Sequence, residues 1–420
     1  MPSPQKKLTF NRESLEPVAP ASRMVEIDMV RGFALFGVLL VNMYGFGADS
    51  IAWNSPTDEL AFAIMRVFFE SKMWTLFSIL FGFGFALQMQ SADARGFSLL
   101  PTYLRRLTAL FIFGAAHALL FDGDILMLYA ELGLVLLVIR GLSTRKLLLL
   151  TVGLILIFPL ARFISDQDLT ADSEDVMNVS EARSELELSQ NTDVYATGSF
   201  IEIAADNASA IPADPLEDLY TPESGLTVLG MFILGFVLGR SNILRDIPGH
   251  VLSIARIRIW GLGLGLVAMA GERLLAATYG YAVFREQQAD TDIQLAGDLL
   301  FTFGASVLAL GYAATLILAA QTPRGKAVLM PLAAVGRLAL TVYLTQTLMF
   351  TTLFYGYGFG QVFQLGPATV TGWAVIIFIV QIVMCQWWLR HFRFGPVEWL
   401  WRSLTYLKWQ PLRVKSNSGS

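Results

Sequence analysis

Apolar runs of about 15 to 25 residues recur along the whole chain and are separated by polar segments. An α-helix needs roughly 20 mainly apolar residues to cross the ~30 Å hydrocarbon core of a bilayer, so each run is a candidate transmembrane helix. The pattern predicts an all-α polytopic membrane protein with about ten such helices. They are expected at 28–46, 73–90, 104–121, 124–139, 146–164, 225–239, 254–276, 298–320, 330–355 and 368–389.

The composition supports a membrane protein. Hydrophobic residues make up 55% of the 420 positions and charged residues only 15%, against roughly 25% in soluble domains. The net formal charge is −4, which does not indicate a nucleic-acid partner. The expected partner is therefore the lipid bilayer.

Residues 60–72 are also apolar, but they carry Arg66, Glu70 and Lys72. Joined to 73–90, they would form a helix of about 46 Å at 1.5 Å per residue, which is too long for one crossing. We therefore expect the chain to break near Ser71, with the segment before it in or near the outer interface.

Lysine and arginine residues are distributed unevenly between the two sides of the predicted helices. Alternate connecting segments and both tails contain nearly all of them, whereas the other connecting segments contain only Arg183 and Arg285. Because basic residues accumulate in cytoplasmic loops, both termini are expected in the cytoplasm, with the chain in a bacterial inner membrane.

The helix pattern also divides the chain into parts. Residues 165–224 contain fifteen Asp or Glu residues against Arg183 alone, so we expect a solvated extracytoplasmic linker. An alternative is that the part from Tyr195 onward packs as a cap over the outer face. The expected parts are a polar tail at 1–23, a five-span bundle at 24–164, the acidic loop at 165–224, a second five-span bundle at 225–389, and a cytoplasmic end at 390–420.

The cytoplasmic end has the pattern of an interfacial helix. Pro396 suits the first position of a helix, and Trp399, Trp401 and Tyr406 are residues typical of interfacial depth. A short amphipathic helix on the cytoplasmic surface is the expected structure.

Ionisable groups inside a bilayer cost roughly 2.5–3.5 kcal/mol or more and often mark functional sites. His117 is the one histidine inside a predicted span, and Arg106 precedes it by eleven residues. This spacing places both on one helix face, about 16 Å apart along the axis. Arg31 and Asn42 repeat the spacing in the first helix. A long anionic substrate from the cytoplasm would place phosphates on the arginines and its reactive end near His117 and Asn42.

Several neighbouring residues extend this candidate site. Asp122 and Asp124 follow His117 closely enough to orient it or to change its charge. Asp28 precedes Arg31 by three residues, as either a second polar group of the site or a simple helical ion pair.

Arg105 adjoins Arg106, and Arg337 begins a polar stripe with Thr341 and Thr345 in the ninth predicted helix. Simpler interpretations stay open, since arginines at helix ends also reach the interface as anchors. An asparagine such as Asn42 can also bridge helices. No metal site is expected, because one histidine and two aspartates are too few ligands.

Several segments resemble a known family. They resemble the YeiB-like bacterial membrane proteins, which share a domain of unknown function numbered 418, and together they extend over nearly the whole chain. The segments are 28–42, 77–84, 124–130, 336–346 and 395–402. More distantly, the first and third predicted helices resemble the transmembrane acyltransferase superfamily, which includes acyltransferase-3 and heparan-glucosaminide acetyltransferase types.

Arg106 and His117 reproduce an arginine-x10-histidine pattern of the acyltransferase-3 enzymes. Those enzymes tend to have a histidine where this chain has Asn42, which is closer to the heparan-glucosaminide type. The resemblance implies transfer of an acyl group from a cytoplasmic acyl-CoA, such as acetyl-CoA, to an extracytoplasmic acceptor such as a glycan.

The expected roles follow from this reaction. The catalytic group would be His117 as general base or acyl acceptor, Asp124 or Asp122 orienting it, and Asn42 donating to the oxyanion. Binding of CoA would fall to Arg106 and Arg31, with Asp28, Arg105 and Arg337 beside them.

Two other functions fit the same residues. In a small-molecule transporter or exporter, the intramembrane charges would line a substrate path, and His117 would relay protons. In a non-catalytic partner of a cell-envelope enzyme, the acidic loop would make the contact. A homodimer is compatible with each of the three.

Overall fold

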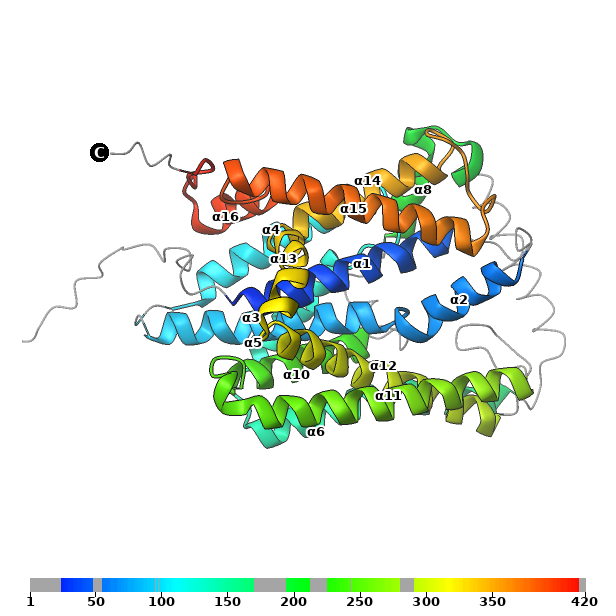
Figure 1. Ribbon diagram of the computed structural model, residues 1–420, viewed down its shortest axis with the longest axis horizontal. Helices are drawn as coiled ribbons and strands as arrows, with labels where there is room; N and C mark the ends of the chain where they lie inside the picture. The colour runs from blue at the N-terminus through cyan, green and yellow to red at the C-terminus, as the bar shows by residue number, and fades with distance from the viewer. Residues whose placement is uncertain are drawn as a thin grey trace, which may run out of the picture.

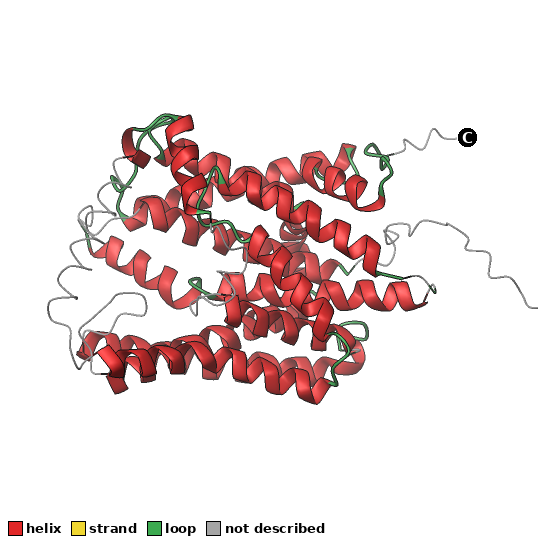
Figure 2. Ribbon diagram, turned by 180° about the vertical axis from the view of Figure 1, so that it is seen from behind, coloured by secondary structure: helices red, strands yellow, loops and turns green. Residues whose placement is uncertain are grey.

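The computed structural model describes residues 24–47, 55–94, 96, 98–169, 194–211, 225–241, 243–279 and 291–414. Figure 2 shows helices joined by loops and no strand in the described part of the chain. The elements are α1 (Val25–Gly47), α2 (Pro56–Phe68), α3 (Lys72–Ala94), α4 (Leu100–Ala118), α5 (Leu126–Ile139), α6 (Thr144–Leu169), α8 (Phe200–Ala210), α10 (Gly225–Arg240), η3 (Pro248–His250), α11 (Val251–Tyr279), α12 (Thr291–Ala319), α13 (Pro323–Arg337), α14 (Ala339–Phe354), α15 (Pro367–His391) and α16 (Pro396–Tyr406).

Most of the long helices run along a common direction, with α1 and α3 in the middle of the bundle (Figure 1). The α11–α12 hairpin and α6 cover one side, and α4, α14 and α15 cover the other. Helices from the two halves of the sequence interleave, because α1 packs against α13 and α15, and α10 packs against α3 and α6.

The prediction of an all-α polytopic membrane protein is confirmed. By length and composition, five helical stretches of the described residues can cross a bilayer, and the α13–α14 pair would make a sixth. Helices α5 and α10 are shorter apolar helices, so the number of ten crossings stays a prediction. The five stretches are Pro56–Ala94, Thr144–Ile164, Pro248–Tyr279, Asp292–Ala319 and Pro367–His391.

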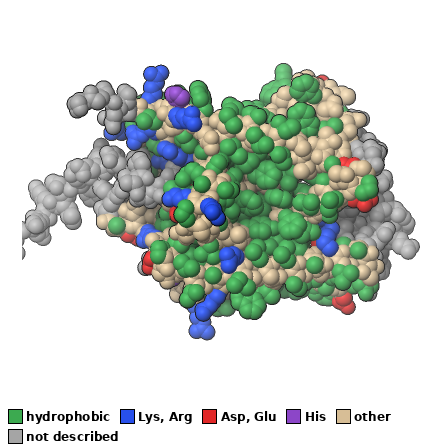
Figure 3. All heavy atoms as spheres, in the orientation of Figure 1, with side chains coloured by type: hydrophobic (Ala, Val, Ile, Leu, Met, Phe, Trp, Pro, Cys, Tyr) green, Lys and Arg blue, Asp and Glu red, His purple; other side chains and the backbone are tan. Residues whose placement is uncertain are grey.

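Hydrophobic side chains cover the middle of the molecule, and Lys and Arg side chains gather at one end (Figure 3). This end, which contains α16 and the start of α4, is called the basic end below. Its charge agrees with the prediction that it faces the cytoplasm. The orientation itself stays a prediction.

The prediction of one continuous helix at 330–355, the ninth in the sequence, is wrong. The chain forms two helices, α13 and α14, which meet at Leu338 with a bend of 81°. Arg337 therefore belongs to α13, whereas Thr341 and Thr345 belong to α14, and the predicted single stripe does not form. The apolar run continued through Leu338, so hydrophobicity alone did not reveal the bend.

The predicted break near Ser71 is confirmed. Helix α2 ends at Phe68 and α3 begins at Lys72, and Ser71 has a φ of 63°. The left-handed backbone at a residue other than glycine interrupts the helix and turns the chain.

Part of the acidic loop packs as a cap. Tyr195 is buried and stacks on Tyr355, and its hydroxyl donates to Asn207 of α8 at 2.7 Å. The Asn207 amide donates in turn to the carbonyl of Leu119 at 3.1 Å. The expectation of a solvated linker is wrong for 194–211, and residues 170–193 and 212–224 lie outside the described residues.

The crossing of α1 and α13 depends on two glycines. A Cβ at Gly32 would lie 2.0 Å from the carbonyl oxygen of Leu332, and one at Gly336 would lie 1.9 Å from that of Asp28. Only glycine allows backbones to approach this closely. The crossing brings Arg31 and Arg337, each next to one of these glycines, to the same region.

Two glycines of α3 provide a matched test of helix packing. A Cβ at Gly82 would lie 1.9 Å from the carbonyl oxygen of Phe232 in α10, whereas a Cβ at Gly84 would meet no atom within 4 Å. We expect Gly82→Ala to destabilise the protein by about 1–3 kcal/mol through overpacking, and Gly84→Ala to be neutral. Unfolding of the purified variants in detergent measures this. Equal stability of the two variants would contradict the packing.

Candidate functional site

A cavity of about 1720 Å³ opens among α1, α3, α4, α13, α14 and α16 at the basic end. Eight basic side chains and two carboxylates line it, together with apolar and aromatic groups such as Phe77, Phe81, Leu110, Tyr129 and Tyr343. The charged residues are Arg31, Arg106, Arg245, Arg337, Arg390, Arg393, Arg402, Lys408, Asp28 and Glu398. We call this space the main cavity.

Four predicted CoA-binding residues line the main cavity together, namely Asp28, Arg31, Arg106 and Arg337. Arg31 donates to Asp28 at 3.0 Å, and Arg337 donates to the carbonyl of Arg393 at 3.0 Å. The fifth, Arg105, is exposed and does not line the cavity, so the structure does not bring it to the site.

Helix α16 is anchored to the wall of the main cavity. The Trp401 indole donates to the carbonyl of Arg106 at 3.0 Å, and the Arg106 guanidinium lies 4.2 Å from the centroid of that ring. A guanidinium over a tryptophan face is held by the ring quadrupole. The predicted amphipathic helix is therefore present, and it also positions Arg106.

Glu398 of α16 caps the start of α14. Its carboxylate accepts hydrogen bonds from the backbone N–H groups of Leu340 (2.6 Å) and Thr341 (2.9 Å) and from the Thr341 hydroxyl. Burial raises the pKa of the Glu398 carboxyl, and these hydrogen bonds counteract that rise. The cap places a negative group at the positive end of the helix dipole and supports the bend at Leu338.

His117 lies at the centre of a buried hydrogen-bonded chain. Its Nδ1 is 2.6 Å from a carboxylate oxygen of Asp124, and its Nε2 is 2.7 Å from the hydroxyl of Thr347. The other oxygen of Asp124 accepts from the backbone N–H of Met127 at 2.9 Å. The His117 residue is 1% exposed. The predicted contact of His117 with Asp124 is present, whereas Asp122 is exposed and makes no hydrogen bond to it.

The direction of each hydrogen bond follows from the donors available. A carboxylate only accepts, so Nδ1 of His117 must carry the proton toward Asp124. In the neutral imidazole, Nε2 is then an acceptor, and the Thr347 hydroxyl donates to it. The acid–imidazole–hydroxyl order is that of a catalytic triad, in which the acid fixes the tautomer of the base.

Thr347 is the functional candidate that the sequence analysis missed. In the same helix, Thr345 and Thr351 donate to the carbonyl four residues earlier, at 2.9 and 2.8 Å, but Thr347 turns its hydroxyl to His117. The four-residue spacing of Tyr343, Thr347 and Thr351 could have revealed a second polar face.

Tyr343 separates the His117 chain from the cavities. Its ring centroid lies 4.8 Å from that of His117, and it lines both the main cavity and a second cavity of about 170 Å³. Asn42 lines the second cavity. The two cavities meet at four residues that line both, Val38, Ile125, Tyr129 and Tyr343.

The predicted site residues therefore fall into three places. The arginines and Asp28 lie in the main cavity, Asn42 lies in the second cavity, and His117 and Asp124 lie behind Tyr343. In the described part of the chain, no group of three or more His, Cys, Asp or Glu side chains is arranged to hold a metal ion.

The fold and these cavities define an all-α membrane protein with a basic, partly apolar internal cavity. Residues 238–408 match the family model "Protein of unknown function (DUF418)". The chain is 33% identical over 426 residues to the uncharacterized protein YxaH of Bacillus subtilis (strain 168), covering 96% of this chain and 99% of YxaH. The chain belongs to this DUF418 family, as its sequence motifs predicted.

Two further relatives agree with that membership. Identity is 32% to the uncharacterized protein YeiB of Escherichia coli (strain K12), over 91% of this chain and 96% of YeiB. It is 25% to an uncharacterized 39.9 kDa protein of Bacillus acidopullulyticus, over 96% of this chain and 100% of that relative. No solved structure matches the chain.

Two threonines of α14 test the hydrogen-bonded chain. Thr347→Val keeps the shape but leaves Nε2 of His117 buried without a donor, so we expect a loss of about 1–3 kcal/mol in stability. Thr351→Val removes hydroxyl bonds to carbonyls of its own helix and to the Tyr357 side chain, but it leaves no buried ring nitrogen without a partner, so it should cost less. Unfolding of both variants in one detergent gives the comparison. A smaller loss for Thr347→Val than for Thr351→Val would contradict the assigned hydrogen bond.

Proposed function

We propose that the protein is a transmembrane acyltransferase that moves an acyl group from a cytoplasmic acyl-CoA to an extracytoplasmic acceptor. The proposal places the basic end in the cytoplasm of a bacterial inner membrane. One observation carries it: the basic cavity leads inward to Tyr343, directly behind which lies the Asp124–His117–Thr347 chain.

The charge and shape of the main cavity suit the donor. Coenzyme A has a phosphate-rich head and a narrow, uncharged arm that ends in the thioester. Guanidinium groups recognise phosphates through paired hydrogen bonds, and eight basic side chains line the cavity against two carboxylates. The aromatic and aliphatic inner wall, with Phe77, Phe81 and Leu110, suits the arm and the acyl group.

The Asp124–His117 pair supports the role of a general base. Asp124 would hold the imidazole with Nε2 free to accept a proton from an acceptor hydroxyl or amine, in the place that the Thr347 hydroxyl now occupies. The acceptor attacks the thioester carbonyl, the carbon–sulfur bond breaks, and His117 passes the proton to the departing thiolate. Asn42 would donate a hydrogen bond to the oxyanion. Tyr343 must turn aside before His117 can act on a thioester in the cavity.

Membrane vesicles that contain the protein test the reaction. Right-side-out vesicles are loaded with acetyl-CoA that carries the label in its acetyl group, and labelled product is measured outside. We expect His117→Asn to lower transfer by at least 100-fold, because a general base contributes about 10²–10⁴-fold. His391→Asn is the control, since His391 is exposed and does not line the cavity. Transfer at the wild-type rate by a folded His117→Asn protein would overturn the assignment.

A transporter is the second candidate, and one observation favours it. The main and second cavities follow one another from the basic end toward Asn42, as the parts of a solute path would. The chemical form of the label separates the two functions. An acyltransferase leaves the acetyl group in an ester or amide outside and free CoA inside, whereas a carrier releases an unmodified solute.

A further inference from the structure

The second cavity has a different character from the main one. Of the described residues that line it, none is charged, and most are apolar. Asn42 and Ser71 are the polar exceptions besides the two tyrosines. The apolar walls are provided by Val41, Phe69, Met73, Trp74, Leu128 and Val228.

The break between α2 and α3 forms one wall of this cavity. Phe69, Ser71 and Met73 line the cavity, whereas the intervening Glu70 and Lys72 do not. The positive φ of Ser71 gives the turn that separates these two sets of side chains. The wall is therefore apolar on one side and ionic on the other.

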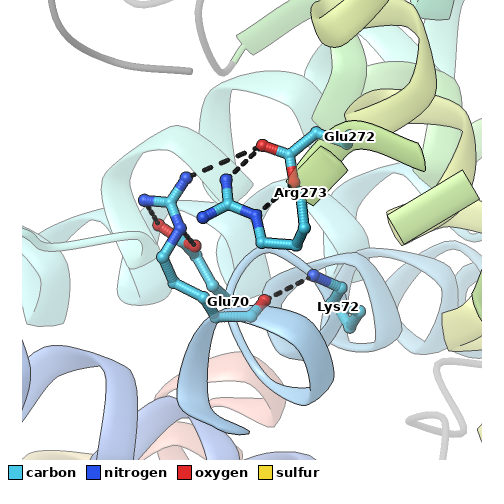
Figure 4. A network of polar contacts seen from close by, with 5 residues as sticks. Glu70, Lys72, Glu272 and Arg273 are labelled. Carbon is cyan, nitrogen blue, oxygen red and sulfur yellow. Dashed lines mark hydrogen bonds and ion pairs between the residues drawn. The ribbon is translucent and has the colours of Figure 1, made fainter. Parts of the chain in front are cut away.

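The ionic side of the break is held by a network with α11, which Figure 4 shows from close by. Arg66 pairs with Glu70 at 3.3 Å and lies 4.0 Å from Glu272, which also pairs with Arg273. Lys72 is wholly buried and donates to the backbone carbonyl of Arg66 at 2.8 Å. Because separating buried charges is costly, the network keeps the wall of the cavity in place.

We infer that the second cavity is the pocket for the acyl chain of the donor and that it accepts a chain of about six carbons. This inference rests on the proposed function. Its first support is adjacency: Val38, Ile125, Tyr129 and Tyr343 line both cavities, so a chain that passes between these side chains from the main cavity enters the second one.

The second support is the size of the cavity. An apolar cavity of about 150 Å³ in another protein stays dry and binds benzene, a six-carbon molecule. The second cavity, at about 170 Å³, is of that size and is similarly apolar. The thioester carbonyl then lies at the junction of the two cavities, beside Tyr343 and within the cavity that Asn42 lines.

The affinity for CoA thioethers with alkyl chains of two to twelve carbons tests the inference. These compounds carry an alkyl chain in place of the acyl group and have no carbonyl to be attacked, so no acceptor is needed, and binding to the purified full chain is measured by calorimetry. Each buried methylene is worth about 0.8 kcal/mol, or roughly fourfold in affinity. We expect affinity to rise by this factor with each added carbon up to a chain of about six carbons, and not to rise for longer chains.

Two variants should change, in opposite directions, the chain length up to which affinity increases. Val41→Phe fills the cavity and should remove the gain beyond two carbons, with binding of CoA itself unchanged, whereas Leu128→Ala should extend the gain to longer chains. Val267→Phe is the matched control, because Val267 is 71% exposed on α11 and lines neither cavity. If Val41→Phe does not fold, as its unfolding curve would show, the chain-length dependence of Leu128→Ala alone tests the acyl pocket.

The possible failures are distinct. If neither CoA nor its thioethers bind, the proposed function fails. If CoA binds but affinity does not depend on chain length, or Leu128→Ala leaves the limit unchanged, the acyl pocket alone is wrong. A gain that continues past ten carbons in the unmodified protein would also overturn it.

Discussion

The cost of placing ionisable groups inside an apolar bundle shapes this structure more than any other constraint. A charge in a low-dielectric interior needs a partner that satisfies it, since the penalty for an unpaired charge is several kcal/mol. Two sets of side chains provide such partners. They are the Asp124–His117–Thr347 chain and the network of Arg66, Glu70, Lys72, Glu272 and Arg273. Their members come from helices far apart in the sequence, so pairing determines which helices meet.

The positions of the two groups explain where space remains inside the protein. The ion network stabilises the α2–α3 break from one side, and Phe69, Ser71 and Met73 line the second cavity on the other. Tyr343 also lines that cavity, and its ring packs against His117. Two polar groups, each held by several hydrogen bonds or ion pairs, thus adjoin different parts of the cavity wall. A cavity between them can stay open although collapse would bury more apolar surface.

Local patterns in the sequence were sufficient for most of the fold. Helix positions, the break at Ser71 and the terminal helix follow from hydrophobic runs, helix length and a proline at a helix start. The bend at Leu338 did not follow, because the group that caps the start of α14 is the carboxylate of Glu398, 58 residues away from Leu340. The residues around Leu338 in the sequence do not indicate such a distant partner.

The site shows the same division. The eleven-residue spacings drew attention to Arg31 and Arg106, which line one cavity. The short separation in sequence between His117 and Asp124 predicted their contact, which the structure contains. The structure also joins Glu70 of the α2–α3 break, through Arg66, to Glu272 and Arg273 of α11, and no spacing along the chain indicates this network. Thr347 was missed because its role depends on the approach of α14 to α4.

The His117 ring is closed off from the main cavity. Both ring nitrogens are occupied, and Tyr343, whose ring centroid lies 4.8 Å from that of His117, lines the cavity whereas His117 does not. Under the proposed function this closure is useful, because a base open to a wet cavity would direct water onto the thioester and waste the donor. The acceptor, arriving from the opposite side, would have to replace the Thr347 hydroxyl at Nε2 and displace Tyr343. Binding of the correct acceptor would then itself assemble the active arrangement, so that transfer is coupled to its presence.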